Sequence, residues 1–202
     1  MVNKNETLSL LAHALQQDGF IRFGEVIFIG ESENGFRPWI SIDIGEKLLS
    51  CTIGLCNDRL DRIVQKALSS VFPGFKNVKL PVPLFRARPD MISSDAPRLI
   101  LATSEGYNID EINDFIGWLR QVAYGFLSEH SDLNAVIRMA KKWNFGDSAQ
   151  QYYIPAMMSI AGCIDQGQYT KVTRDMLAKQ DVALAEKYDA YLRKLAALTK
   201  EL

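Results

Sequence analysis

The sequence predicts an α+β fold, with an antiparallel sheet and packed helices in residues 1–105 and an all-helical region in residues 106–202. Two observations carry this prediction. Residues 20–55 contain stretches that alternate between apolar and polar positions, which is typical of half-buried strands. From residue 108 onward, apolar residues recur every three or four positions, which is typical of amphipathic helices. We expect a sheet of about four to five strands, with the helical region packed on it as one compact unit.

The chain is predicted to begin with a helix over residues 7–17, where Thr7 can cap the N-terminus. Asp18 and Gly19 would end this helix. Residues 20–29 follow as a strand because they are rich in aromatic and β-branched side chains. The polar run "GESENG" then predicts a turn.

The most strongly patterned stretch is "GEVIFIGESENGFRPWISIDIG", residues 24–45. In its second half, Ile40, Ile42 and Ile44 alternate with Ser41 and Asp43. A register shift of one residue would expose every isoleucine, so the pattern specifies which face is buried. We therefore predict a scaffold strand whose isoleucines face the helices and whose Asp43 faces away. A further strand over residues 48–55 would complete a three-stranded meander.

Asn57 or Asp58 is predicted to cap the next helix, and Pro73-Gly74 would end it. Residues 78–84 alternate again, but two prolines remove ladder donors, which favours an edge strand or an extended arm. A long loop is expected over residues 86–97, and a last short strand over residues 98–103. Beyond it, the apolar periodicity predicts five helices, over residues 108–127, 132–143, 148–163, 168–179 and 181–202.

The charge pattern argues against nucleic acid as a partner. The formal net charge is −1, the sequence pI is about 6.1, and the longest basic cluster is Lys141-Lys142. A small basic patch assembled by the fold remains the open alternative. No stretch approaches the roughly 20 apolar residues of a membrane span, and the N-terminal residues do not resemble a signal peptide. We expect a cytoplasmic protein without a membrane partner.

Metal and cofactor motifs are not recognisable in the sequence. His13 and His130 lie on different predicted elements, and neither has a second ligand two to four residues away. Cys51 and Cys56 are five apart on a predicted strand, so they would point to opposite faces. The glycines form no phosphate-binding loop. We expect neither a metal nor another cofactor.

The sequence offers two possible catalytic arrangements, and in both cases a role in packing or as a solvated surface is favoured over catalysis. Cys56 directly precedes a helix start, where a thiol can have a lowered pKa, but an odd number of cysteines favours inert free thiols. Asp43 with nearby glutamates could converge as acid and base, although solvated strands look the same. An enzyme of unfamiliar class, a hydrolase or transferase using acids of the sheet face, is the alternative function. The glutamates concerned are Glu25, Glu31 and Glu33.

The loop "PLFRARPDMI" fits binding better than catalysis. Arginine beside aromatic and methionine side chains is the composition of interface hot spots. The alternative is a solvated loop whose Phe85 fills the core. The predicted binding residues are Phe85, Arg86, Arg88 and Met91.

The run "LLAHALQQDGFIRFGEVIFIG", residues 10–30, resembles the opening of uncharacterised bacterial α+β proteins of the toxin-immunity type. The resemblance covers the N-terminal quarter of the chain and transfers no site residue. It implies a non-catalytic inhibitor whose partner is another protein. We therefore expect a non-enzymatic protein-binding module, an immunity or accessory protein of a bacterial cytoplasm. The sequence leaves the oligomeric state open.

Overall fold

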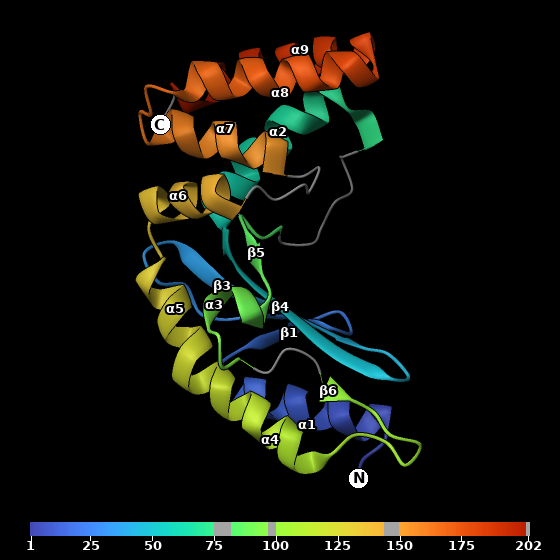
Figure 1. Ribbon diagram of the computed structural model, residues 1–202. Helices are drawn as coiled ribbons and strands as arrows, with labels where there is room; N and C mark the ends of the chain where they lie inside the picture. The colour runs from blue at the N-terminus through green and yellow to red at the C-terminus, as the bar shows by residue number, and fades with distance from the viewer. Residues whose placement is uncertain (75–81, 97–99, 144–149, 201–202) are drawn as a thin grey trace. The chain divides into compact units, whose positions relative to one another are not determined.

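The computed structural model describes residues 1–74, 82–96, 100–143 and 150–200. An N-terminal antiparallel sheet precedes a helical C-terminal half, which confirms the predicted fold class (Figure 1). Within the described residues the sheet has six strands in the order β1-β2-β3-β4-β5, with β6 beside β4. The strands are β1 Ile21–Phe23, β2 Ile27–Ile29, β3 Phe36–Ile44, β4 Leu48–Asn57, β5 Arg86–Ala87 and β6 Ile100–Leu101.

Helices account for most of the remaining described chain, and one long helix contains a π-helical segment, η2. They are α1 Lys4–Gln17, α2 Asp58–Val71, α3 Pro89–Ile92, α4 Ile109–Trp118, η2 Leu119–Ala123, α5 Tyr124–Glu129, α6 Leu133–Trp143, α7 Gln150–Ile160, α8 Gln166–Gln180 and α9 Val182–Thr199.

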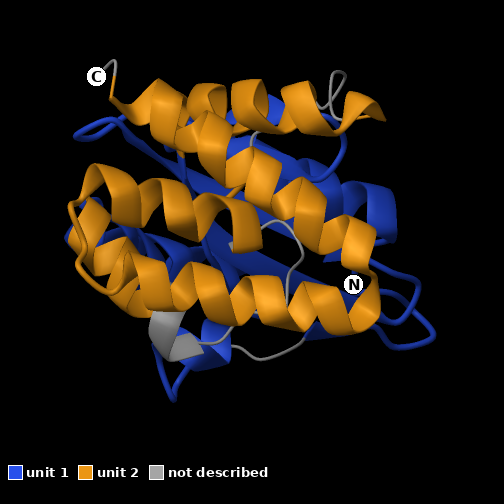
Figure 2. Cartoon of the chain, turned by 90° about the horizontal axis from the view of Figure 1, so that it is seen from above, with its two compact units in different colours: residues 1–56, 85–132 blue, residues 57–84, 133–202 orange. Residues whose placement is uncertain are grey.

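The chain forms two compact units, coloured separately in Figure 2. Unit 1 contains residues 1–56 and 85–132, and unit 2 contains residues 57–84 and 133–202. This division differs from the boundary predicted at residue 105. It arises because β5 returns to pair with β4, Ile53 opposite Ala87, so the intervening segment with α2 is an excursion into unit 2.

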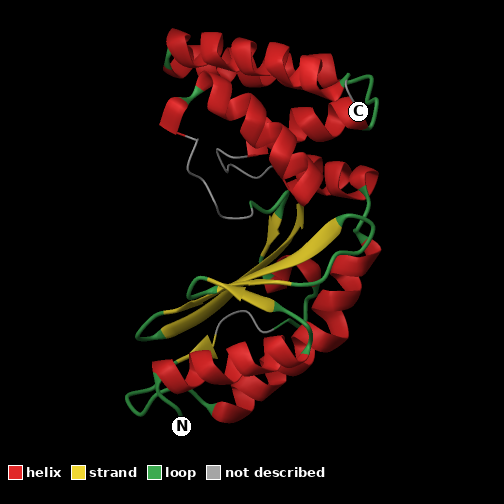
Figure 3. Ribbon diagram, turned by 180° about the vertical axis from the view of Figure 1, so that it is seen from behind, coloured by secondary structure: helices red, strands yellow, loops and turns green. Residues whose placement is uncertain are grey.

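The sheet of unit 1 has one face packed against helices α1, α4 and α5 (Figure 3). Ile40, Ile42 and Ile44 are buried on this face, and Asp43, which alternates with them, is exposed. The predicted orientation of this strand is therefore confirmed. Alternating burial on β4 continues the same core, because Leu49, Cys51 and Ile53 are buried as well.

Local structure departs from the sequence prediction in unit 1 at two places. The strand predicted over residues 20–29 is two strands, because Gly24 adopts a left-handed φ of 70° and turns the chain between them. The loop predicted over residues 86–97 contains β5 and the short helix α3. Residues 75–81 and 97–99, which include most of one predicted edge strand and the start of another strand, lie outside the described residues.

Asparagine side chains cap the first two long helices. Asn3, not Thr7, caps α1, and its side chain and that of Glu6 form a capping box. Thr7 is buried one turn later, where its hydroxyl donates to the Asn3 carbonyl at 2.9 Å. Of the two residues predicted to cap α2, Asn57 is the cap, and its side chain accepts from the Arg59 and Leu60 amides.

Unit 2 accommodates a proline inside α7. Pro155 has no N–H to donate, so the carbonyl of Gln151 lacks its usual helical partner. The hydroxyl of Tyr188, on α9, donates to that carbonyl at 3.3 Å, and the hydroxyl of Tyr191 donates to the carbonyl of Tyr152. The Tyr188 hydroxyl therefore replaces the backbone bond that Pro155 cannot make, and the Tyr191 hydroxyl adds a second side-chain bond to the same helix.

Candidate protein-binding surface

The second face of the unit 1 sheet, which we call the outer face, points away from α1, α4 and α5. Strand register decides which residues share it. Ile21 pairs with Ile29, which in turn pairs with Trp39, and Phe23 pairs with Ile27. All five side chains therefore point to the face opposite the buried isoleucines.

The outer face continues across β4 and β6. Leu48 alternates with buried Leu49 and so points to the outer face, and its pairing partner is Leu101. Four large apolar side chains of this face are exposed: Ile21 by 66%, Phe23 by 40%, Leu48 by 36% and Leu101 by 65%. Single exposed apolar residues are ordinary, whereas several on one face are typical of an interaction surface.

Arg86 lies on β5, an edge strand of the sheet, and its side chain reaches over Trp39 of β3. The guanidinium carbon of Arg86 is 5.6 Å from the centre of the Trp39 ring, which is cation–π geometry. On one side, Gly54 of β4 pairs with Arg86 of β5. On the other side, Gly54 lies opposite Trp39 of β3, because each is six residues from the hydrogen-bonded pair Gly45 and Leu48 at the turn between the two strands. Because Gly54 has no side chain, the arginine can reach the indole ring.

The sequence-predicted site residues are distributed between core and surface. Phe85 is fully buried and packs edge-to-face against Phe126, so it belongs to the core and not to a surface, contrary to the prediction. Arg86 and Arg88 are exposed, and Arg88 forms an ion pair with Asp90 at 3.2 Å. Met91 is half-buried.

The acidic residues considered for catalysis lie on exposed segments. Glu25, Glu31 and Asp43 are exposed, and the carboxylate of Glu33 accepts a hydrogen bond from Ser128 at 3.0 Å. Among the described residues, no group of three or more histidine, cysteine or acidic side chains could hold a metal ion. No helix in this part of the chain is both long enough and apolar enough to cross a membrane.

The nucleophile considered from the sequence is inaccessible. Cys56 is fully buried in a cluster with Ile29 and Trp39. The two histidines have other contacts: His13 is 2.9 Å from the Gln17 side-chain amide, and His130 bonds the Phe126 carbonyl. The geometry supports the interpretation of Cys56 as a packed core residue.

The three cysteines are free thiols in the structure, as the sequence predicts. Cys51 and Cys56 are buried, burial raises the pKa of the Cys51 thiol, and Cys163 is only half-buried. We expect iodoacetamide to modify Cys163 first and the other two only on unfolding, because the thiolate is the reactive form. Mass spectrometry of the native protein and of a Cys163→Ser control tests this order. Rapid, stoichiometric labelling of Cys56 at mildly acidic pH would contradict it.

A charged network joins the end of α1 to the π-helical segment within unit 1. Arg120 donates to both carboxylate oxygens of Asp18, at 2.9 and 3.1 Å, and the Tyr124 hydroxyl donates at 2.9 Å. Burial alone would raise the pKa of Asp18, but the bonds from Arg120 and Tyr124 and the arginine charge outweigh it and lower the pKa. The network fixes the helices that support the sheet, which is a structural role.

No protein family, curated protein or solved structure matches this chain.

Proposed function

We propose that this protein is a non-enzymatic protein-binding module and that its partner docks on the outer face of the unit 1 sheet. The observation that carries the proposal is that four exposed apolar side chains, two on β1 and one each on β4 and β6, point to that one face. The resemblance of residues 10–30 to immunity proteins favours an immunity or accessory protein of a bacterial cytoplasm, with another protein as the partner.

The strands that carry Leu48 and Leu101 are held in place by long-range contacts. The Tyr107 hydroxyl donates to the Gly45 carbonyl at 2.8 Å, at the turn between β3 and β4. The backbone of Tyr107 in turn pairs with Val2, with hydrogen bonds of 2.8 and 2.9 Å. A surface that is ordered before binding loses less conformational entropy when a partner docks.

The outer face also has the mixed chemistry of protein interfaces. Arginine is enriched at binding hot spots, and Arg86 is the exposed member of its pair with Trp39, which is itself only 4% exposed. The distance along β4 from Gly54 to Leu48 is six residues, or roughly 20 Å at about 3.3 Å per residue. A footprint of that length is comparable with one side of an ordinary protein–protein interface.

The double change Leu48→Ser with Leu101→Ser is expected to weaken partner binding at least tenfold, about 1.4 kcal/mol. Both side chains are exposed, so each change should alter stability by no more than about 0.5 kcal/mol. A photo-crosslinking residue at position 101 identifies the partner in cells, and calorimetry with the purified pair gives the dissociation constants.

The double change Arg86→Ala with Arg88→Ala should weaken partner binding by a factor of the same order.

The matched control is Leu10→Ser on α1, because Leu10 is 37% exposed and lies off the outer face. This variant should bind as tightly as the parent. If the Leu48/Leu101 variant binds as tightly as the Leu10 variant, the outer face is not the docking surface. If only the arginine variant retains full affinity, the apolar residues and not the arginines recognise the partner.

A further inference from the structure

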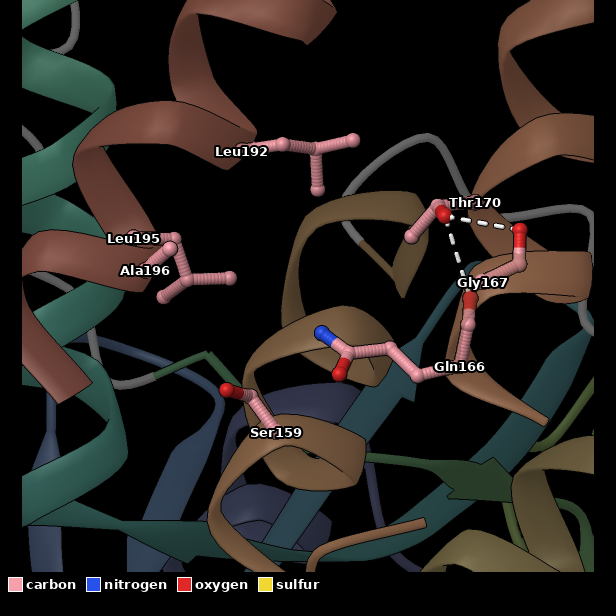
Figure 4. Close-up of a pocket in the computed structure, with 7 residues that line it drawn as sticks. All are labelled: Ser159, Gln166, Gly167, Thr170, Leu192, Leu195 and Ala196. Carbon is pink, nitrogen blue, oxygen red and sulfur yellow. Dashed lines mark hydrogen bonds between the residues drawn. The ribbon is translucent and has the colours of Figure 1, made fainter. Parts of the chain in front are cut away.

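Helices α7, α8 and α9 of unit 2 line a cavity of about 190 Å³ that is open to solvent on one side (Figure 4). Its polar side chains come from α7 and α8, and its apolar wall comes from α9. The lining residues are Ser159, Gln166, Gly167, Thr170, Leu192, Leu195 and Ala196. None of them is ionisable, so the cavity offers no charge to a ligand.

Two polar lining residues already donate hydrogen bonds within the protein. Gln166 Nε2 donates one of its two N–H groups to the Pro155 carbonyl at 3.2 Å, which leaves the second N–H as a donor and Oε1 as an acceptor. The Thr170 hydroxyl donates to the backbone carbonyls of Gln166 and Gly167, at 3.0 and 3.1 Å, shown as dashed lines in Figure 4.

Ser159 completes the same arrangement. The Ser159 hydroxyl lies 3.3 Å from the Thr199 hydroxyl, and either oxygen can be the donor in this contact. The lone pairs of Ser159, Thr170 and Gln166 therefore remain as acceptors. A ligand that matches these lone pairs supplies a hydrogen-bond donor, and it can also accept from the second N–H of Gln166.

Size and the apolar wall restrict the ligand further. Leu192 and Leu195 form one side of the cavity, and the Gln166 side chain reaches into the space opposite them (Figure 4). An apolar cavity of about 150 Å³ in another protein holds benzene, so this one has room for a single ring.

We infer that this cavity binds a small neutral molecule that joins an apolar ring to one hydroxyl or N–H donor. The ring would lie against the leucines while the donor reaches Gln166 Oε1 or the Thr170 hydroxyl. Phenol is the simplest probe of this chemistry, and toluene is its counterpart without a donor. The site belongs to unit 2 and is independent of the docking surface proposed for unit 1.

Titration of the full chain with phenol, followed by heteronuclear NMR, is expected to give saturable shifts of residues on α7, α8 and α9. Toluene should bind at least tenfold more weakly, because it leaves the acceptors without a partner. Ala196→Leu should abolish phenol binding by filling the cavity. Ala197→Leu, on the neighbouring exposed position outside the lining, should not change it.

The inference is wrong if phenol produces no saturable shifts, if toluene binds equally well, or if Ala196→Leu binds phenol like the Ala197→Leu control. Far-ultraviolet circular dichroism of both leucine variants confirms that each is folded. Gln166→Leu gives a separate reading, since it removes the central acceptor and should lower phenol affinity more than toluene affinity.

Discussion

Replacing Ile42 by alanine is expected to lower the free energy of unfolding by about 2–5 kcal/mol, the usual range for deleting a large aliphatic side chain from a core. Ile42 is fully buried in the middle of β3, between Ile40 and Ile44 on the same face. Its backbone amide donates to the Val26 carbonyl at 2.8 Å, so neighbouring strands hold the position and limit collapse around the cavity.

Denaturant unfolding followed by circular dichroism measures this effect. Asp43→Ala is the matched control, because Asp43 is the next residue of β3 and is exposed on the opposite face. It should change stability by no more than about 0.5 kcal/mol. An Ile42→Ala protein whose unfolding midpoint equals that of the parent would show that this face is not core.

Replacing Asp61 by asparagine is expected to stabilise the protein by about 1–3 kcal/mol near pH 7. Asp61 lies on α2 of unit 2, is only 8% exposed, and accepts a hydrogen bond from the Tyr153 hydroxyl at 2.6 Å. Burial raises the pKa of Asp61 to about 6 from 3.8, the bond from Tyr153 opposes the rise, and the charge of Asp58 adds to it.

The direction of the pH effect follows from the raised pKa. Between about pH 4 and pH 6 the folded protein holds a proton on Asp61 that the unfolded chain has released. The protonated carboxyl therefore contributes stability at low pH, and this contribution is lost as the pH rises through about 6. A difference of two pKa units corresponds to about 3 kcal/mol, which sets the upper end of the expected gain.

Unfolding free energies of Asp61→Asn and the parent, measured near pH 4 and pH 7, test this expectation. The gain should be present at pH 7 and small at pH 4, because the asparagine oxygen can still accept from Tyr153. Tyr153→Phe should act in the opposite sense and destabilise at pH 7, since it removes the one bond that favours the charged carboxylate. If Asp61→Asn and the parent have equal unfolding free energies at pH 7, the buried charge of Asp61 does not destabilise the protein.

The sequence by itself determined those features that depend on neighbouring residues in the chain. The alternation of Ile40, Ile42 and Ile44 with Asp43 set the buried face of β3. Asn57 was identifiable as a helix cap because an asparagine before an amphipathic run can satisfy the first free amides. The left-handed turn at Gly24 is a local feature that the pattern did not predict, because residues 20–29 read as one continuous strand.

Only the tertiary structure decided the candidate surface. Nothing in the local sequence connects Leu48 with Leu101, or Trp39 with Arg86, because strand pairing brings each pair together across dozens of residues. The loop around Phe85 has the composition of an interface. In the structure, however, Phe85 is buried and Arg86 is exposed, so the two neighbours belong to different environments. Periodicity reports which side of a single strand is apolar, whereas the register between strands decides which of those side chains meet and which remain exposed.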